Sequence, residues 1–139
     1  MSAHPFRGTT VLTYGTFDLF HVGHLRLLER ARLLGDRLIV GVSTDEFNAT
    51  KGKKAVLRFA ERREIVASLR CVDLVIPECA WGQKEQDIVA HAVGVFVMGN
   101  DWVGEFDGLA SDTCQVRYLP RTEGISTTLL RGHLRSLAA

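Results

Sequence analysis

The chain has 139 residues, the length of one ordinary globular domain, so we expect a single domain over residues 1–139. Apolar residues make up 46% of the chain and charged residues 24%, which is typical of a soluble protein with a hydrophobic core. Lys and Arg total 17 against 16 for Asp and Glu, and this balance excludes the strongly basic surface of a nucleic-acid carrier. No apolar run approaches the ~20 residues needed to cross a bilayer, so we expect no membrane partner.

The three cysteines, Cys71, Cys79 and Cys114, are odd in number and lack the C-x-x-C spacing of zinc sites. We expect separate free thiols in a reducing compartment. Residues 1–8 lack the apolar core of a signal peptide. Together these features predict a cytoplasmic protein.

Short apolar runs alternate with helical patterns along the chain. We expect strands over 10–14, 37–42, 72–76, 95–98 and 116–119, the third and fifth stopped by prolines. We expect helices over 22–34, 58–69, 86–92 and 126–137, and a polar stretch with a lysine cluster over 43–57. This alternation predicts βαβ units and a mainly parallel five-stranded sheet. Such sheets bind ligands beyond the carboxyl ends of their strands, so the turns after the strands are the informative places.

The turn after the first strand carries the most specific string in the chain, GTFDLFHVGH over 15–24. It is neither a Rossmann G-x-G-x-x-G loop nor a Walker A loop. Thr16 offers a hydroxyl and an amide to phosphate oxygens. His21 and His24 are three residues apart, which places both on one side of a helix's first turn, where unpaired N–H groups favour an anion. Gly23 between them leaves room for a phosphate.

Two other interpretations of the histidines stay open. A histidine at a helix start is often a cap or a solvated side chain, and a pair of histidines can be half of a zinc site. No third zinc ligand lies at a recognised spacing. For the whole string we favour phosphate chemistry.

Basic residues follow the second and third predicted strands. Lys51 and Lys53 belong to K-G-K-K over 51–54, and Lys84 ends C-A-W-G-Q-K. A lysine run is often a solvated loop, but beside a strand end its ammonium groups are placed to neutralise a polyphosphate. Lys84, near Trp81, is a candidate for a second phosphate, while Trp81 is equally consistent with packing.

The string RTEGISTT over 121–128 follows the last strand and opens the last helix. Arg121 adds a permanent charge with a planar donor fork. Gly124 supplies a turn, and residues 126–128 place hydroxyls and amides at a second positive helix end. A helix cap needs only one such residue. The two helix starts could therefore grip one triphosphate from two directions.

Together GTFDLFHVGH and RTEGISTT resemble the cytidylyltransferases of the HxGH nucleotidyltransferase superfamily, over roughly residues 11–131. Within that family they are most similar to the enzymes that act on glycerol 3-phosphate. The resemblance implies a Rossmann-like α/β fold with three layers, α/β/α, a homodimer, and Mg²⁺ coordinated by phosphates without metal ligands from the protein. It also implies transfer of CMP from CTP to sn-glycerol 3-phosphate, giving CDP-glycerol and pyrophosphate for teichoic acid or related polyol-phosphate polymers.

The resemblance also implies residue roles by motif position. As catalytic residues it implies His21, His24, Lys53 and Arg121. As CTP contacts it implies Thr16, Phe17, His21, His24, Lys53, Asp101, Trp102, Arg121, Thr122, Gly124, Ile125, Ser126, Thr127 and Thr128. Lys51 and Lys84 would contact the acceptor phosphate. Asn100 departs from the family pattern, which has an acidic residue there. Cytidylyl or adenylyl transfer to another small phosphorylated acceptor, such as ribitol phosphate, phosphoethanolamine or a cofactor precursor, and a non-catalytic nucleotide-binding sensor remain the alternatives.

Overall fold

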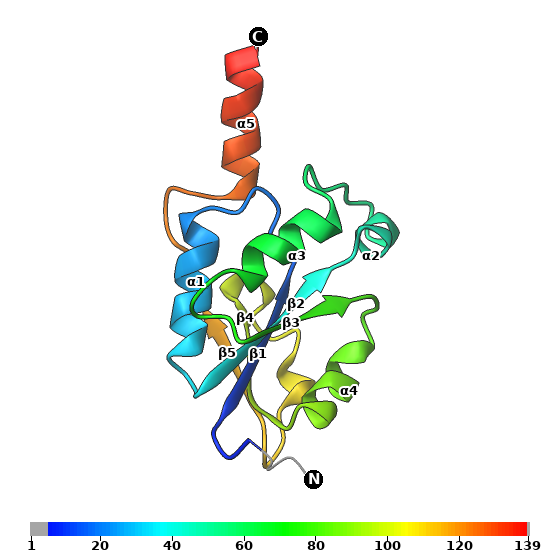
Figure 1. The fold of residues 1–139 in the computed structure, drawn as a ribbon, viewed down its shortest axis with the longest axis vertical. Helices are drawn as coiled ribbons and strands as arrows, with labels where there is room; N and C mark the ends of the chain where they lie inside the picture. Colours follow the sequence, from blue (N-terminus) through cyan, green and yellow to red (C-terminus); the bar gives the residue numbers. More distant parts are fainter. Residues whose placement is uncertain (1–5, 139) are drawn as a thin grey trace.

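The computed structural model describes residues 6–138 (Figure 1). Its sheet is made of β1 (Thr10–Gly15), β2 (Arg37–Ser43), β3 (Leu74–Glu78), β4 (Val93–Gly99) and β5 (Gln115–Leu119). The helices are α1 (Val22–Arg32), α2 (Asp45–Thr50), α3 (Phe59–Ala67), α4 (Gln83–Ala90) and α5 (Thr127–Ala138), with short 3₁₀ helices η1 (Asn100–Trp102) and η2 (Asp107–Leu109). The strands are parallel in the order β3-β2-β1-β4-β5, which confirms the predicted sheet.

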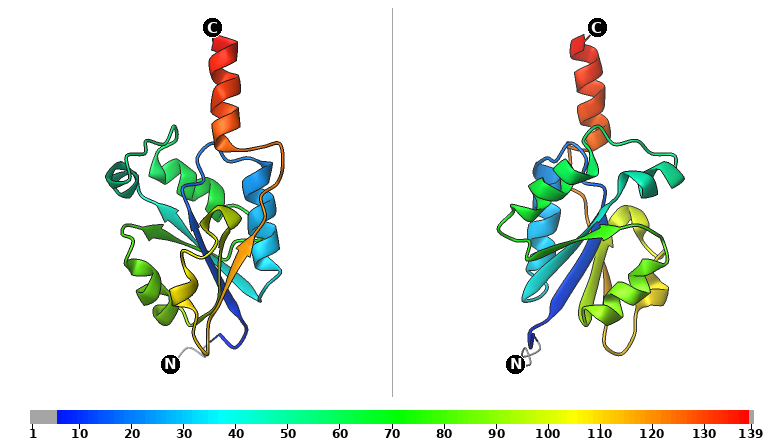
Figure 2. Two further views of the ribbon diagram at one scale, coloured as in Figure 1. Left: turned by 180° about the vertical axis from the view of Figure 1, so that it is seen from behind. Right: turned by 45° about the vertical axis from the view of Figure 1, so that its right-hand side comes forward.

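Alternation along the strands divides the apolar side chains between two cores. Val11 and Val40 belong to the core beneath α1 and α3. Leu12 and Ile39 belong to the opposite core, beneath α4 and the segment 100–109. Helices thus cover both faces of the sheet, as Figure 2 also shows, and the three-layer α/β/α architecture is confirmed.

Strand β1 lies in the middle of the sheet, between β2 and β4. The chain runs outward to one side through β2 and β3 and then returns to the other side through β4 and β5. Parallel sheets form a ligand-binding crevice where the strand order reverses in this way, at the carboxyl ends of the strands. Helix α5 projects from this same end of the molecule (Figures 1 and 2).

Three local expectations differ from the structure. Pro77 does not stop the third strand but lies inside β3, paired in register with Val42. β3 is an edge strand, where the N–H that proline lacks is not needed for the ladder. The polar stretch 43–57 contains α2, whose N-cap Thr44 accepts the N–H of Phe47 at 3.1 Å. The two 3₁₀ helices after β4 were not expected.

No helix in the described part of the chain, residues 6–138, is long and apolar enough to cross a membrane.

Candidate active site at the carboxyl end of the sheet

His21 and His24 cap the start of α1 through their own side chains. The Gly23 N–H donates to Nδ1 of His21 at 3.0 Å, and the backbone N–H of His21 donates to Nδ1 of His24 at 3.2 Å. The two rings stack with centroids 3.9 Å apart. The helix start therefore holds both imidazoles in one fixed orientation.

This capping also sets where the ring protons lie. Because each Nδ1 accepts a hydrogen bond, each neutral ring carries its proton on Nε2. Burial lowers the pKa of His21. Burial, reinforced by His21 and partly opposed by Asp18, lowers the pKa of His24 to about 4. Near neutral pH both rings are thus neutral Nε2–H donors, and the buried Nε2 of His21 has no hydrogen-bond partner within residues 6–138.

The turn before α1 needs an unusual backbone. Phe17 and Leu19 have φ of 53° and 48°, in the left-handed region that non-glycine residues rarely adopt. At Gly23 an added Cβ would come within 2.8 Å of the His21 ring. Gly23 therefore makes room for the folded-back imidazole, which refines the expectation that it leaves room for a phosphate.

Asp18 fixes this turn from below. Its buried carboxylate accepts the N–H groups of Val56 at 2.7 Å and Leu57 at 2.9 Å, and the Arg131 guanidinium at 2.6 Å. Burial alone would raise the pKa of Asp18, but these three donors outweigh it and hold the pKa below its usual value. Asp18 is therefore charged and fully engaged with the protein.

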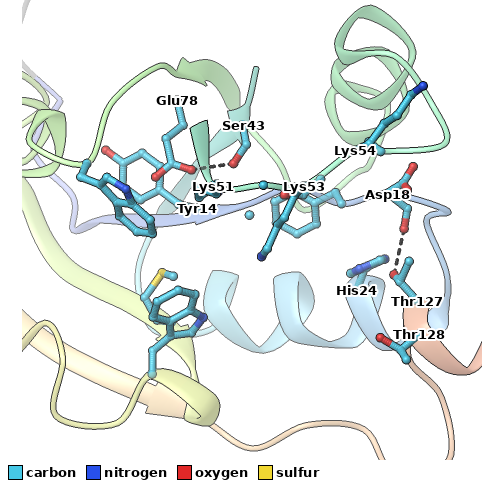
Figure 3. A pocket seen from close by; sticks show the side chains of 18 of the residues that line it. Tyr14, Asp18, His24, Ser43, Lys51, Lys53, Lys54, Glu78, Thr127 and Thr128 are labelled. Atoms are coloured by element: carbon cyan, nitrogen blue, oxygen red, sulfur yellow. Dashed lines mark hydrogen bonds between the residues drawn. The ribbon is translucent and has the colours of Figure 1, made fainter. Parts of the chain in front are cut away.

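Two cavities meet above the turn and form one cleft, and Figure 3 draws side chains of the one that lies toward β2 and β3. The first has a volume of about 500 Å³ and lies toward β2 and β3. The second has a volume of about 690 Å³ and lies toward β4, β5 and the start of α5. Both are lined by the same central residues, Tyr14, Gly15, Thr16, Phe17, His24, Met98, Trp102, Thr127 and Thr128.

Lysines and aromatic rings line the first cavity. The Nζ of Lys51 lies 4.4 Å from the centre of the Phe47 ring and 5.3 Å from that of Trp81. Burial lowers the pKa of Lys51. Lys53 extends into the cavity in Figure 3, whereas Lys54 points away from it. The lysines at 51 and 53, expected at the site, are thus brought together there.

Lys84 also lines the first cavity but is buried. Its Nζ lies 2.7 Å from the carboxylate of Glu78, which also accepts the Ser43 hydroxyl at 2.7 Å. The rings of Tyr14 and Trp81 lie 4.8 and 5.0 Å from the same Nζ. Lys84 therefore places a buried ammonium group at the base of the cavity, and the buried Glu78 carboxylate balances its charge.

The second cavity holds the remaining predicted nucleotide contacts except Gly124. Asp101 and Arg121 pair across it, and Thr122, Ile125 and Ser126 line it, as does His21. Ser126 caps α5, because its hydroxyl accepts the Leu129 N–H at 3.1 Å. Gly124 does not line the cavity; its φ of 79° makes the turn that brings the neighbouring residues there.

Sequence reasoning did not single out Asp18, Glu78 or Arg62 as site residues. Arg62 is fully buried and donates to the carbonyl oxygens of Thr16 at 2.8 Å and Ser43 at 2.7 Å, which joins the ends of β1 and β2. Asp18 lies within the GTFD string, which was a signal for it. For Glu78 and Arg62 the sequence carried none, because their partners are remote in the chain.

Within residues 6–138 no group of three or more His, Cys, Asp or Glu is placed to hold a metal ion. The carboxylates that face the cleft are already paired with cations: Asp18 with Arg131, Glu78 with Lys84, and Asp101 with Arg121.

Similarity to known proteins extends over most of the chain. Residues 12–133 match the family described as cytidylyltransferase-like. The chain is 58% identical to a glycerol-3-phosphate cytidylyltransferase of Bacillus subtilis, over 91% of this chain and 98% of the relative. It is also 58% identical to the enzyme of that name from Staphylococcus aureus, over 89% of this chain and 93% of the relative. In fold it is similar to a lipopolysaccharide core biosynthesis protein of Thermoplasma volcanium, with a TM-score of 0.66 and 23% identity over 80% of this chain and 96% of the other. The chain therefore belongs to the cytidylyltransferase-like family.

Proposed function

We propose that the protein transfers CMP from CTP to sn-glycerol 3-phosphate, giving CDP-glycerol and pyrophosphate. One observation carries the proposal: a single cleft joins a lysine-lined cavity to a cavity closed by Arg121 and the start of α5, with the neutral imidazole of His24 lining both cavities and that of His21 lining the second. The two ends suit two phosphorylated substrates that meet at the histidines. The two relatives at 58% identity are named for glycerol 3-phosphate, which favours this acceptor.

The reaction needs no general base, because the acceptor phosphate is already an anion. One of its oxygens attacks the α-phosphorus of CTP in line, and a new P–O bond forms. The bond from that phosphorus to the bridging oxygen breaks, and the electron pair leaves with pyrophosphate. Catalysis then consists of positioning and of stabilising charge that develops on the phosphate oxygens.

We assign the positioning and the charge stabilisation to particular residues of the cleft. The Nε2–H groups of His21 and His24 donate to the α-phosphate and its bridging oxygen. Lys53 and Arg121 neutralise the leaving pyrophosphate, together with the amides of residues 126–128 at the helix start. Arg121 is paired with Asp101 in this structure, so in our assignment it leaves Asp101 when it binds the pyrophosphate group.

Further nucleotide contacts follow from the lining of the second cavity. We assign Thr16 and Phe17 to the phosphates near β1, and Asp101 and Trp102 to the cytosine side. Thr122, Gly124 and Ile125 shape the turn around the nucleotide. The acceptor phosphate binds between Lys51 and Lys84 in the first cavity.

We propose Mg²⁺ as the cation that accompanies CTP. It favours oxygen ligands and keeps much of its water, and the carboxylates facing the cleft are engaged with Arg131, Lys84 and Arg121. Triphosphate oxygens and water would therefore supply its ligands, in the cavity lined by Lys53 and Thr128. When bound, the ion neutralises charge on the phosphates.

We also propose a homodimer that acts in the cytoplasm on the route to teichoic acid or another polyol-phosphate polymer. Exposed apolar side chains support the dimer, since Leu134 and Leu137 of α5 are 56% and 82% exposed. Free Cys71, Cys79 and Cys114 support a reducing compartment. Light scattering at several protein concentrations tests the dimer, which requires twice the mass of one chain.

The central experiment measures pyrophosphate release from CTP with and without sn-glycerol 3-phosphate, in the presence of Mg²⁺. Acceptor-dependent release and a CDP-glycerol product are expected. Ribitol 5-phosphate and phosphoethanolamine, and ATP in place of CTP, form the comparison panel, and faster turnover with any of these would replace the proposed substrates. CTP binding without any release would mean a nucleotide sensor.

A further inference from the structure

Arg131 lies one turn into α5 and joins two sides of the cleft. Its guanidinium donates to the Asp18 carboxylate at 2.6 Å and lies 3.4 Å from the Lys54 carbonyl oxygen. The neighbouring Thr127 hydroxyl donates to the Asp18 carbonyl oxygen at 3.0 Å, a bond drawn in Figure 3. The first turn of α5 is therefore tied both to the GTFD turn and to the end of the lysine loop, which we define as residues 51–54.

The first three residues of the lysine loop are anchored to α2. The N–H groups of Lys51 and Lys53 donate to the Asn48 carbonyl at 3.0 and 2.9 Å, and that of Gly52 donates to the Ala49 carbonyl at 3.0 Å. At the end of the loop Asp18 accepts the two N–H groups that follow, at positions 56 and 57. Gly52 has a φ of 70°, and Lys53 and Lys54 are exposed. The position of the end of the loop, at Lys54, thus depends on what holds the Asp18 carboxylate and the Lys54 carbonyl.

Helix α5 is attached to the rest of the molecule mainly through the same first turn. Beyond Arg131, residues 132–138 are all exposed, and the helix projects away from the sheet (Figures 1 and 2). Thr127 and Thr128 line both cavities, and Arg131 lines the first. Anything that binds at the start of α5 therefore fixes the turn that carries Arg131.

We propose that Arg131 is a positioning residue. It couples nucleotide binding in the second cavity to the placement of the lysine loop beside the first cavity, where the acceptor phosphate binds. This inference rests on the proposed function. A nucleotide held at the start of α5 fixes Arg131 against Asp18 and Lys54, and the loop then presents Lys51 to the acceptor phosphate and Lys53 to the leaving pyrophosphate. Because such coupling is reciprocal, acceptor binding also strengthens nucleotide binding.

A purely structural ion pair predicts a different result. The Arg131 side chain is 36% exposed and Asp18 is buried, but the Asp18 carboxylate keeps the N–H groups of Val56 and Leu57 as donors when the guanidinium is removed. Loss of the guanidinium should then leave the fold intact and act on the coupling between the two substrates. The coupling is consequently the quantity to measure.

The test uses the full chain with Mg²⁺, sn-glycerol 3-phosphate and α,β-methylene-CTP, an analogue that cannot release pyrophosphate. Calorimetry gives the acceptor Kd with and without the analogue. In the parent protein we expect the analogue to tighten acceptor binding by about 5-fold or more, the low end for coupled sites. In Arg131→Gln this factor should fall to near one with little change in the Kd of the analogue alone. Arg131→Lys should retain part of it, and Arg135→Gln, on the exposed end of α5, should retain all of it.

Hydrogen exchange gives a second measurement. The analogue should protect segment 51–57 in the parent and in Arg135→Gln, and should fail to protect it in Arg131→Gln. An unchanged coupling factor in Arg131→Gln overturns the inference and leaves the function standing, as does the absence of coupling in the parent. If neither Arg131 variant folds, an unprotected 51–57 segment in the parent with bound analogue overturns it. A parent that shows no acceptor-dependent pyrophosphate release refutes the proposed function itself.

Discussion

His21 and His24 are joined by a reciprocal cap in which the backbone N–H of His21 donates to Nδ1 of His24, while Nδ1 of His21 accepts the N–H of Gly23. Each ring thus uses its two nitrogens differently, Nδ1 as an acceptor at the helix start and Nε2–H as a donor that we assign to the substrate. Asparagine and glutamine separate these roles, because the asparagine oxygen reaches the place of Nδ1 and the glutamine amide reaches that of Nε2.

The substitution His24→Asn should keep the cap and lose the donor. We expect kcat/KM for CTP to fall by about 10²–10³-fold, the scale for one transition-state donor. The free energy of unfolding should change by less than about 1 kcal/mol because the His21 N–H keeps an acceptor. Initial rates of pyrophosphate release and urea unfolding measure the two effects. The matched variant His24→Gln should lose less activity and more stability, and equal activity losses in both would refute donation through Nε2.

His24 also makes stability depend on pH. Burial, with His21 adding to it, lowers the pKa of His24 to about 4 in the folded protein, against 6.5 for an unperturbed histidine. Between these values the unfolded chain binds more protons than the folded chain, so stability falls as the pH drops from 6.5 toward 4. A shift of this size corresponds to about 3 kcal/mol.

Urea unfolding between pH 7 and pH 4.5 checks this expectation. The parent should lose stability over that range more steeply than His24→Asn, which lacks the imidazole at position 24 and keeps only that of His21 at the helix start. Asp18 does not affect this comparison. Its pKa is lowered below 3.8, so its contribution to the free energy of unfolding is lost only at more acid pH. Parallel pH profiles for the parent and the variant would contradict the assignment.

The buried pair of Lys84 and Glu78 calls for a paired substitution. Lys84→Met alone leaves Glu78 as a buried unpaired carboxylate and should cost about 3–5 kcal/mol. Glu78→Gln together with Lys84→Met removes both charges and should regain most of that stability. Because we assign Lys84 to the acceptor phosphate, the KM for sn-glycerol 3-phosphate should stay raised in the double variant, while the KM for CTP stays near the parent value. If both KM values return to those of the parent, Lys84 has only a structural role.

The sheet was predictable because its signals are local. Each strand is a short apolar run, and the residues of β1, β2 and β4 are buried almost throughout, as expected for a central parallel strand. α2 was not predictable, since its six residues, DEFNAT, have no apolar period and are held by the Thr44 cap. Pro77 misled for a related reason: its tolerance depends on β3 being at the edge, which the sequence does not state.

The site residues also divide into those that the sequence predicts and those that it does not. His21, His24 and Arg121 belong to compact strings, and the structure brings their segments to one cleft. Which charges are buried was not predictable, because that depends on partners far along the chain. Arg62 and Arg63 are neighbours in sequence, yet one is fully buried and the other exposed.

These two arginines make a matched test of what holds the cleft together. Arg62 donates to the carbonyl oxygens of Thr16, Ser43 and Leu57 at 2.7–2.9 Å. Arg62→Met fills similar space but leaves these carbonyls without their donor, so we expect a loss of more than about 3 kcal/mol in the free energy of unfolding. Arg63→Met, on the exposed side of the same helix, should change it by less than about 0.5 kcal/mol.

Urea unfolding measures both variants, and Arg62→Lys refines the interpretation. Lysine keeps the charge but has no planar fork to reach the ends of β1 and β2 together, so its stability should lie between that of the parent and that of Arg62→Met. Equal costs for the methionine variants at 62 and 63 would mean that the carbonyls find other donors. In that case the Asp18 contacts contribute more to holding the turn after β1 than Arg62 does, and Asp18→Asn should then be the more damaging change.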